Sequence, residues 1–229
     1  MSGNATIVVN TPPAAYAVTG GGNYCSGGTG VNVGLDGSVL DVYYQLYNGA
    51  SAIGSPVMGD GTVINFGLMT AAGTYTVFAT DAITGCTANM SSSAVVSIQP
   101  LPVAYPVTGG GRYCAGGSGL AVGLSTSDVG VNYQLYRGAD AVGSPLPGSG
   151  EMLVFGTFTE EGMYSVVGTN TTTACTNNMT GVVEIFIDPV PNVYTVTGGG
   201  SYCSGGEGVS TGLSGSDLYI WYQLYDGSM

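Results

Sequence analysis

Five cysteines are the residues of this 229-residue chain best suited to chemistry, because a thiol can oxidise to a disulfide or bind a metal ion. They are Cys25, Cys86, Cys114, Cys175 and Cys203. Their order repeats, with 89 residues from the first to the third, the second to the fourth and the third to the fifth. Zinc is the weaker alternative, because the chain has neither a Cys-x-x-Cys pair nor a histidine to complete four ligands.

Two other patterns resemble functional motifs. Gly20–Gly22 and Gly109–Gly111 look like phosphate-binding loops, but they lack the Lys-Ser/Thr ending and a following helix, so we interpret them as turns. Glu160–Glu161 is the only adjacent carboxylate pair, and the residues one period earlier are Ala71–Ala72. This difference favours an exposed loop over the acid and base of a glycosidase.

Calcium is a further question for an acidic chain, because carboxylates are its preferred ligands. Asp41 aligns with Gly130 and Asp81 with Asn170 in the next period, and no acidic position of the first complete copy recurs in the second. A calcium site in every repeat is therefore not expected, and a single local site stays open. Our prediction is that the chain holds no metal and no cofactor.

The charge of the chain excludes several classes of function. Only two cations, Arg112 and Arg137, stand against 14 acidic residues, which gives a net charge of −12. We therefore exclude nucleic acid and anionic membranes as direct partners. Without His or Lys the chain lacks a base near neutral pH and a Schiff-base amine, so we predict that it is not an enzyme. No apolar run approaches the ~18 residues of a membrane span, so we predict no membrane insertion.

The cysteine period belongs to a sequence repeat. Residues 14–102 align with 103–191 without a gap, and 44 of the 89 positions are identical. Residues 192–229 begin a third, partial copy, and residues 1–13 are predicted to be the last strand of a preceding one. We expect this sequence to be a window from a longer protein. The alternative is a short gene that begins at Met1.

Each copy is predicted to be an all-β immunoglobulin-like sandwich, because short segments alternate apolar and polar residues between Gly, Asn, Asp and Ser clusters. Seven strands are expected in the first copy: Tyr16–Thr19, Val31–Leu35, Val42–Tyr47, Ala52–Val57, Val63–Leu68, Tyr75–Ala79 and Ala94–Ile98. Val42, Tyr44 and Leu46 should face the core. Tyr75 and its counterpart Tyr164 stand where a tyrosine corner would open the sixth strand.

Proline-rich joins connect the copies. Gln99-Pro-Leu-Pro102 and Asp188-Pro-Val-Pro191 lie between the last strand of one copy and the first strand of the next. Proline favours an extended, stiff backbone. We therefore expect tandem 89-residue repeats in an extended, rod-like array.

Several aromatic side chains should point outward from the predicted strands. They are Tyr43, Tyr47, Tyr136, Trp221 and Tyr225. They could form a strip on which sugar rings stack. Cross-strand pairing or lateral packing against another chain is the interpretation that we favour.

Together these motifs resemble a known family. Tyr113-Cys-Ala-Gly-Gly-Ser-Gly, Tyr133-Gln-Leu-Tyr, Gly73-Thr-Tyr-Thr-Val and Gly85-Cys-Thr-Ala-Asn-Met are similar to the Ig-like repeats of large secreted surface proteins of Bacteroidetes, of the adhesin-like or gliding-associated type. The resemblance covers essentially the whole chain. It implies an extracellular, cell-surface protein that is exported through a C-terminal sorting domain, which this sequence does not contain.

In an exported repeat, two cysteines per copy predict one disulfide per copy. Pairing within a copy, Cys25 with Cys86 and Cys114 with Cys175, is the first choice and leaves Cys203 without a partner. Strand direction argues against it, because the two positions of one copy should lie at opposite ends, ~25 Å apart, unless the loop at residues 20–30 bridges them. A disulfide between copies, Cys25 to Cys175, is the second solution.

We therefore predict a non-catalytic stalk or fibre module of an extracellular surface adhesin, whose partners are neighbouring repeats or copies of the same protein. One alternative is a filament subunit in which residues 1–13 complete a neighbour's sandwich by strand addition. Another is a carbohydrate-binding module that recognises surface glycans through Tyr43 and Trp221.

Overall fold

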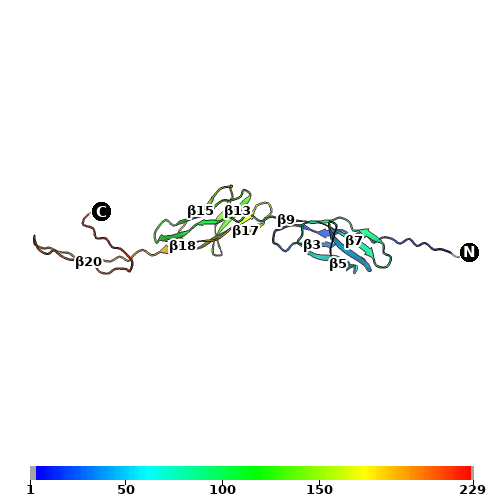
Figure 1. Cartoon of the computed structure of the whole chain (residues 1–229), viewed down its shortest axis with the longest axis horizontal. Coiled ribbons are helices and arrows are strands. Elements are labelled where there is room, and N and C mark those ends of the chain that lie inside the picture. Colours follow the sequence, from blue (N-terminus) through cyan, green and yellow to red (C-terminus); the bar gives the residue numbers. More distant parts are fainter. Residues whose placement is uncertain (1–3, 228–229) are drawn as a thin grey trace. The chain divides into compact units, whose positions relative to one another are not determined.

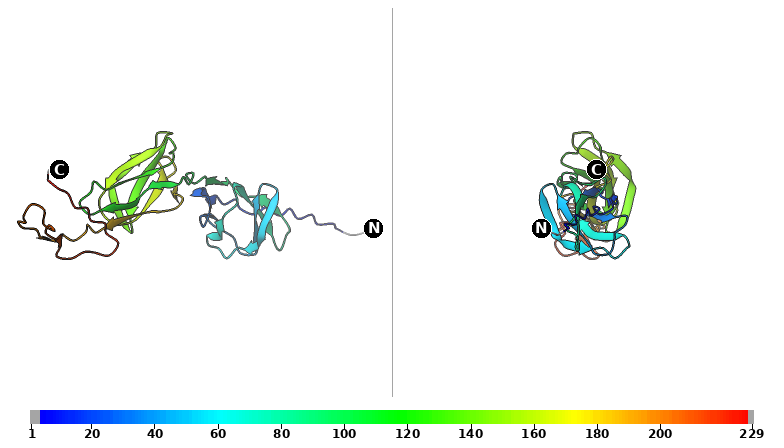
Figure 2. Two further views of the ribbon diagram at one scale, coloured as in Figure 1. Left: turned by 60° about the vertical axis from the view of Figure 1, so that its left-hand side comes forward. Right: turned by 90° about the vertical axis from the view of Figure 1, so that its right-hand side faces the viewer.

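The computed structural model describes residues 4–227, and predictions that involve Met1–Gly3 or Ser228–Met229 lie outside it. Strands and loops make up the described chain, and no helix is drawn in it (Figure 1, Figure 2). The first copy has nine strands: β1 (Val18–Gly20), β2 (Gly22–Cys25), β3 (Val31–Leu35), β4 (Val42–Asn48), β5 (Ser51–Met58), β6 (Ile64–Met69), β7 (Gly73–Asp81), β8 (Thr87–Asn89) and β9 (Ala94–Gln99).

The second copy repeats these strands, and every bound lies 89 residues later than its counterpart. Its strands are β10 (Val107–Gly109), β11 (Gly111–Cys114), β12 (Leu120–Leu124), β13 (Val131–Arg137), β14 (Asp140–Pro147), β15 (Leu153–Phe158), β16 (Gly162–Asn170), β17 (Thr176–Asn178) and β18 (Val183–Asp188). Two short strands follow, β19 (Val196–Gly198) and β20 (Thr211–Leu213).

Each of the two copies forms two sheets. In the first, β1, β3 and β6 make one sheet, and the other has the order β2-β9-β7-β4-β5, with β8 paired to β7. The second copy has the same order, β10-β12-β15 and β11-β18-β16-β13-β14. One sheet thus holds β1, β3 and β6, and the sheet that faces it holds β4, β7 and β9. This is the strand arrangement of an immunoglobulin-like sandwich. The predicted fold class is confirmed.

The core lies between the two sheets, as the alternating pattern predicts. On β4 the inward side chains Val42, Tyr44 and Leu46 are at most 2% exposed, and Tyr43 on the other face is 40% exposed. β7 behaves in the same way, with Tyr75 and Val77 buried. Strands with one apolar face thus explain how this sheet covers the core.

The predicted tyrosine corner is present in both copies. The hydroxyl of Tyr75 donates to the carbonyl oxygen of Ala71 at 2.8 Å. The hydroxyl of Tyr164 donates to the carbonyl oxygen of Glu160 at 2.9 Å. Each bond runs back four residues and fixes the loop in front of the seventh strand of its copy.

Two strands of each copy were not predicted, β2 and β8 in the first. β2 lies in the Gly-rich segment that the sequence suggested to be a loop, and it pairs in parallel with β9. Gly20 makes this possible, because its φ is +86° and an added Cβ would lie 2.1 Å from the carbonyl oxygen of Asn32. Only glycine fits that turn, which carries the chain from the sheet of β1 to the sheet of β2.

The two partial copies form far fewer paired strands than the complete copies. The strand predicted within residues 1–13 is absent from residues 4–13, and Ile7 and Val9 are each 89% exposed. In residues 192–227 only β19 and β20 pair, and no side chain is buried. A strand needs a hydrogen-bonded neighbour, and the strands that flank these segments in a complete copy are missing from the described chain.

The described chain divides into two compact units that do not follow the repeat boundaries. The first unit runs to Ala104 and also includes Asp128–Tyr133 and Val167–Asn178. The second unit consists of Tyr105–Ser127, Gln134–Val166 and the residues from Met179 onward. The turn that carries Cys175, although part of the second copy, therefore lies in the first compact unit.

Candidate functional site: paired and unpaired cysteines

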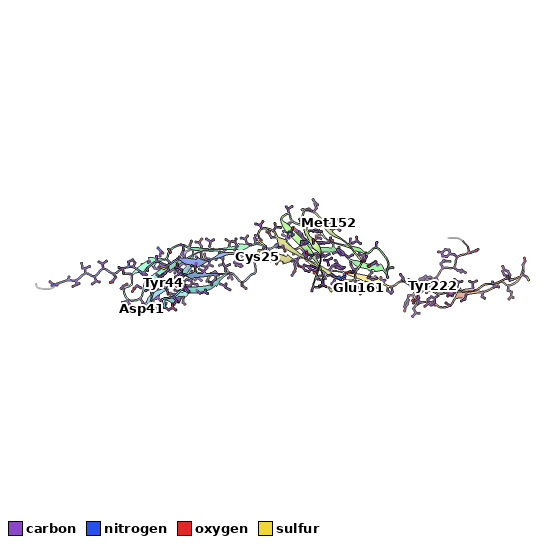
Figure 3. The ribbon with its side chains drawn as sticks, turned by 180° about the vertical axis from the view of Figure 1, so that it is seen from behind. Cys25, Asp41, Tyr44, Met152, Glu161 and Tyr222 are labelled. Atoms are coloured by element: carbon purple, nitrogen blue, oxygen red, sulfur yellow. A yellow bond between two sulfur atoms is a disulfide. The ribbon has the colours of Figure 1, made fainter. Side chains whose placement is uncertain are left out.

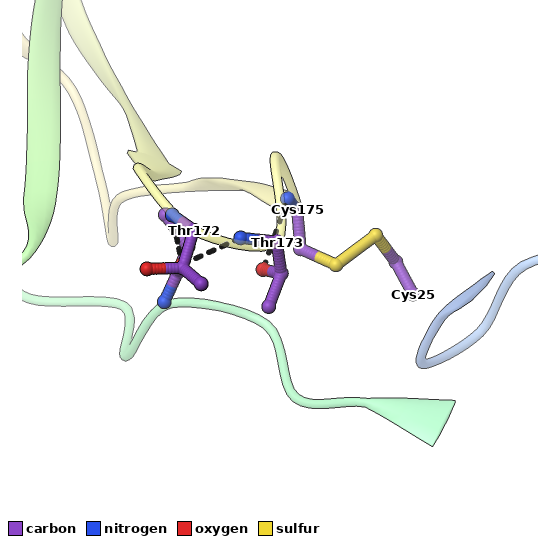
Figure 4. Close-up of a disulfide and its surroundings, with 5 residues drawn as sticks. Cys25, Thr172, Thr173 and Cys175 are labelled. Carbon is purple, nitrogen blue, oxygen red and sulfur yellow. Dashed lines mark hydrogen bonds between the residues drawn. A yellow bond between two sulfur atoms is a disulfide. The ribbon is translucent and has the colours of Figure 1, made fainter. Parts of the chain in front are cut away.

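One disulfide joins Cys25 of the first copy to Cys175 of the second (Figure 4). The two Cα atoms are 5.6 Å apart, and 150 residues separate the cysteines in the sequence. Cys175 is completely buried. Both cysteines lie in the first compact unit.

Strand β2 positions Cys25. Because β2 runs parallel to β9, Cys25 lies opposite Gln99, at the C-terminal end of its copy. The N–H of Ser26 donates to the carbonyl oxygen of Gln99 at 2.8 Å, and the N–H of Gly28 donates to that of Cys25 at 2.9 Å. These bonds hold the cysteine at the point where the chain leaves the first sandwich.

A tight turn after β16 positions Cys175. The side-chain oxygen of Asn170 accepts hydrogen bonds from the N–H groups of Thr172, at 2.9 Å, and Thr173, at 3.0 Å. The N–H of Cys175 donates to the hydroxyl of Thr173 at 3.3 Å. Such a side-chain-capped turn is what Asn and Asp commonly form, and Figure 4 shows it next to the disulfide.

Asn177, two residues after the disulfide, fastens the same turn to the join between copies. Its side-chain amide donates to the carbonyl oxygen of Pro102 at 2.8 Å. The corresponding residue in the first copy is Ala88, which has no such donor. The disulfide and this hydrogen bond therefore both link the Cys175 turn of the second copy to the C-terminal end of the first.

The preferred pairing within a copy was wrong. β7 runs antiparallel to β9, so the Cys86 turn after β7 lies at the end of the sandwich opposite to Cys25. Figure 3 shows this separation, because Cys25 and Asp41, which accepts a hydrogen bond from Ala82 beside the turn, label opposite ends. The loop at residues 20–30 does not bridge the gap, since β2 fixes it along β9. The second solution, Cys25 to Cys175, is the one found.

Three thiols are free in the described chain: Cys86, Cys114 and Cys203. The disulfides predicted for Cys86 and Cys114 within their own copies are absent, because each of these residues lies at an end of its copy that faces no complementary cysteine. Cys114 is exposed and Cys86 is half-buried. The sulfur of Cys86 lies 3.9 Å from the carbonyl oxygen of Asn10.

Charged groups sit beside both free thiols of the complete copies. The carboxylate of Asp81 accepts from the N–H groups of Thr84 and Ile83, and these bonds lower the pKa of Asp81 below its ordinary value. Near Cys114, hydrogen bonding to Arg112 lowers the pKa of Asp188. The guanidinium of Arg112 also lies 5.1 Å from the ring centre of Phe186.

The predicted aromatic contact residues are distributed over all three copies. Tyr43 and Tyr47 lie on β4, whereas Tyr136 lies on β13, where Asn132 takes the place of Tyr43. Trp221 is 98% exposed and Tyr225 is 68% exposed, both in the third copy. Their role in surface contact stays a prediction.

Three further candidates for a function are the carboxylate pair at Glu160–Glu161, metal-binding clusters and membrane-spanning helices. Glu160 forms an ion pair with Arg137 on an exposed loop. Between residues 4 and 227, no three His, Cys, Asp or Glu side chains lie close enough together to hold a metal ion. No helix of the described chain is long and apolar enough to span a membrane.

Sequence reasoning missed the turn residues Asn170 and Asp81, which set the position of the second cysteine of each copy. The signal was present: an Asx residue lies five positions before the cysteine in both copies, with a threonine two positions before it. Sequence reasoning also missed β2 and its counterpart β11. The residues that could have indicated these strands are Tyr24 and Tyr113, which stand among the glycines. The hydroxyl of Tyr113 donates to the carbonyl oxygen of Thr159 at 2.6 Å.

No protein-family model and no curated protein matches the chain. Among solved structures, a Ca²⁺-stabilised adhesin with which an Antarctic bacterium binds ice is 17% identical, with a TM-score of 0.41, over 82% of this chain and 53% of that one. The chain thus spans about half the length of that adhesin. Fibronectin(III)-like modules of Clostridium thermocellum CbhA are 16% identical, with a TM-score of 0.39, over 76% of this chain and 95% of theirs. Murine CEACAM1b is 12% identical, with a TM-score of 0.36, over 72% of this chain and 96% of that one.

Proposed function

We propose that this chain is a non-catalytic stalk segment of an extracellular surface protein, in which a disulfide links one immunoglobulin-like repeat to the next. The observation that carries the proposal is the bond between Cys25 and Cys175. A disulfide within a sandwich would stabilise that sandwich alone, whereas this bond connects consecutive copies. Such a bond persists in an oxidising, extracytoplasmic compartment.

The linkage has a direct mechanical consequence. When the chain is pulled at its two ends, force passes through the Cys25–Cys175 bond and bypasses the residues between them. The cysteines are 150 positions apart in the sequence, and the segment between them cannot extend while the bond is intact. At up to ~3.6 Å per residue, the bond withholds about 500 Å of extension. A segment that limits its own extension suits a protein that holds a binding region away from a surface.

Other features support the same proposal. The strand bounds repeat at intervals of 89 residues, so one structural unit is used again along the chain. The proline-rich joins favour a stiff connection, and the extended array stays a prediction from them. The resemblance to secreted Bacteroidetes surface proteins supports an extracellular location.

Single-molecule force spectroscopy tests the proposal. The oxidised chain should extend by about 500 Å less than the reduced chain, and Cys25→Ser should extend like the reduced chain without any reductant. Cys86→Ser is the matched control and should keep the full restriction, because its thiol is free. Equal lengths for the oxidised and reduced chains would exclude the proposed stalk mechanism.

A further inference from the structure

We propose that Asn177 is a positioning residue for the Cys25–Cys175 disulfide, because its side chain anchors the join between the two copies beside the bond. The inference rests on the proposed function, in which this disulfide links consecutive repeats, and it assigns the residue that keeps the two thiols within reach of each other. Asn177 acts through the backbone of the join rather than on the sulfur atoms.

The anchor is a hydrogen bond to the join itself. The side-chain amide of Asn177 donates to the carbonyl oxygen of Pro102 at 2.8 Å. Pro102 is buried and Asn177 is half-buried, so water competes weakly for this bond. Both residues lie in the first compact unit, which also contains both cysteines of the disulfide. The hydrogen bond and the disulfide therefore act within the same compact unit.

A second hydrogen bond holds the other side of the join. The N–H of Ser26, the residue after the first cysteine, donates to the carbonyl oxygen of Gln99 at 2.8 Å. The join is thus held at Gln99 by the first sandwich and at Pro102 by the amide described above. Between these anchors lie Pro100 and Leu101, and the ring of a proline fixes its φ. Few free backbone angles therefore separate the neighbour of one thiol from the strand beside the other.

The amide and the second thiol project from the same side of one extended segment. Cys175 directly precedes β17, Asn177 lies within it, and residues two apart on an extended chain point the same way. Burial agrees, because Cys175 is buried and Asn177 is half-buried, whereas the residue after each of them is exposed. One side of the segment thus contacts the first copy through its sulfur and the join through its amide. Two contacts fix an orientation that a single contact leaves free to rotate.

The first copy shows that the strand itself does not need asparagine at this position. The counterpart of Asn177 is Ala88, on β8. Ala88 pairs with Ala79 of β7 in the way that Asn177 pairs with Gly168 of β16. The residues on either side are the same in both copies: Thr87 and Thr176, Asn89 and Asn178. We therefore expect Asn177→Ala to leave β17 in place and to remove the anchor alone.

The reaction that Asn177 assists is the exchange of two protein thiols with a small disulfide such as oxidised glutathione. The thiolate of one cysteine attacks the glutathione disulfide, releases one glutathione thiol and leaves a mixed disulfide. The thiolate of the other cysteine then attacks the protein sulfur of that mixed disulfide and releases the second glutathione thiol. The protein loses two electrons and two protons, and the glutathione disulfide gains them. Because the second attack is intramolecular, the equilibrium depends on the effective concentration of one thiol at the other.

Redox equilibration of the full chain tests the proposal. The reference chain has only Cys25 and Cys175 left to react, because it carries Cys86→Ser, Cys114→Ser and Cys203→Ser. It is brought to equilibrium with reduced and oxidised glutathione, and mass spectrometry after an acid quench gives the oxidised fraction. Asn177→Ala in this chain should lower the equilibrium constant for oxidation about 3- to 10-fold, as expected for the loss of one hydrogen bond. Asn177→Asp keeps the shape but not the donor, so it should lower the constant at least as much.

A matched control and a second measurement separate positioning from folding. Asn178→Ala changes the next side chain, which is exposed, and should leave the oxidation constant unaltered. Hydrogen exchange of the reduced chains reports whether β17 is formed. The N–H groups of Thr176–Asn178 should be equally protected in Asn177→Ala and in the reference chain, because alanine forms the same strand in the first copy.

Three results would overturn the proposal. They are an unchanged oxidation constant in Asn177→Ala, an equal fall in Asn178→Ala, and loss of protection of β17 in reduced Asn177→Ala, since local unfolding would then explain the weaker disulfide. Each of them leaves the stalk proposal standing as long as the reference chain forms the Cys25–Cys175 bond. A reference chain that does not form this bond would exclude the stalk proposal and the role of Asn177 together.

Discussion

At the scale of single residues, tyrosines replace the tryptophan and buried disulfide that fill many immunoglobulin-like cores. Tyr44 and Tyr133 are completely buried, and burial raises the pKa of each hydroxyl. Both hydroxyls still find a partner. That of Tyr44 accepts from the N–H of Val39 at 3.0 Å, and that of Tyr133 accepts from the N–H of Asp128 at 2.9 Å. A buried polar group that has a hydrogen-bond partner costs little folding free energy, whereas a buried polar group without a partner destabilises the fold.

Tyr44→Phe should therefore lower the free energy of unfolding by about 1–2 kcal/mol, because it leaves the N–H of Val39 without its acceptor. Urea denaturation of the oxidised chain measures this change. Tyr43→Phe is the matched control, since that side chain is on the exposed face of the same strand. An equal loss from both variants would show that the Tyr44 hydroxyl contributes nothing particular.

Asp81 makes the turn before Cys86 sensitive to acid, whereas the corresponding turn before Cys175 has no carboxylate. Hydrogen bonds from Thr84 and Ile83 lower the pKa of its carboxyl in the folded chain. The stability that the carboxylate contributes is present above the ordinary Asp pKa of about 3.9 and is lost as pH falls through the lower folded-state value. Asn170 holds the corresponding turn and does not titrate.

We accordingly expect hydrogen exchange at residues 82–86 to become faster, relative to residues 171–175, as pH falls below about 4. In Asp81→Asn this difference should vanish, because both turns then have the same uncharged acceptor. Hydrogen-exchange mass spectrometry, corrected for the intrinsic effect of pH, makes the comparison within one molecule. An unaltered difference in Asp81→Asn would rule out the carboxylate as its cause.

At the scale of elements, β2 decides where the first cysteine of a copy lies. The alternation of apolar residues predicted the strands that build the core, because burial of one face imposes that period. It did not predict β2, in which Gly22 and Asn23 are exposed and Cys25 only half-buried. Parallel pairing with β9 holds this strand, and pairing between distant segments leaves no local periodic signal. For the same reason the pairing within a copy was ranked first, although strand direction argued against it, and the bond found between Cys25 and Cys175 was the second solution.

Gly20→Ala tests the importance of the turn that leads into β2. The substitution places a Cβ 2.1 Å from the carbonyl oxygen of Asn32 at a φ of +86°. We expect a loss of about 2 kcal/mol or more in stability, with slower formation of the Cys25–Cys175 bond on reoxidation. Gly27→Ala is the control, because its φ is also positive, at +80°, but an added Cβ would meet nothing within 4 Å. Similar losses in both variants would mean that the contact with Asn32 is not decisive.

At the scale of the whole molecule, the central claim is that the disulfide connects consecutive copies, and the chain's few cations allow a direct test. Trypsin cuts after Lys and Arg, and this chain has only Arg112 and Arg137. Complete digestion under denaturing conditions, after free thiols are blocked, therefore gives fragments 1–112, 113–137 and 138–229.

Mass spectrometry of the unreduced digest decides between the two pairings. The account predicts that Cys25–Cys175 keeps fragment 1–112 attached to fragment 138–229, and that fragment 113–137, with Cys114 blocked, is released. Pairing within the copies would instead attach fragment 113–137 to fragment 138–229 and release fragment 1–112. That second result would contradict the account.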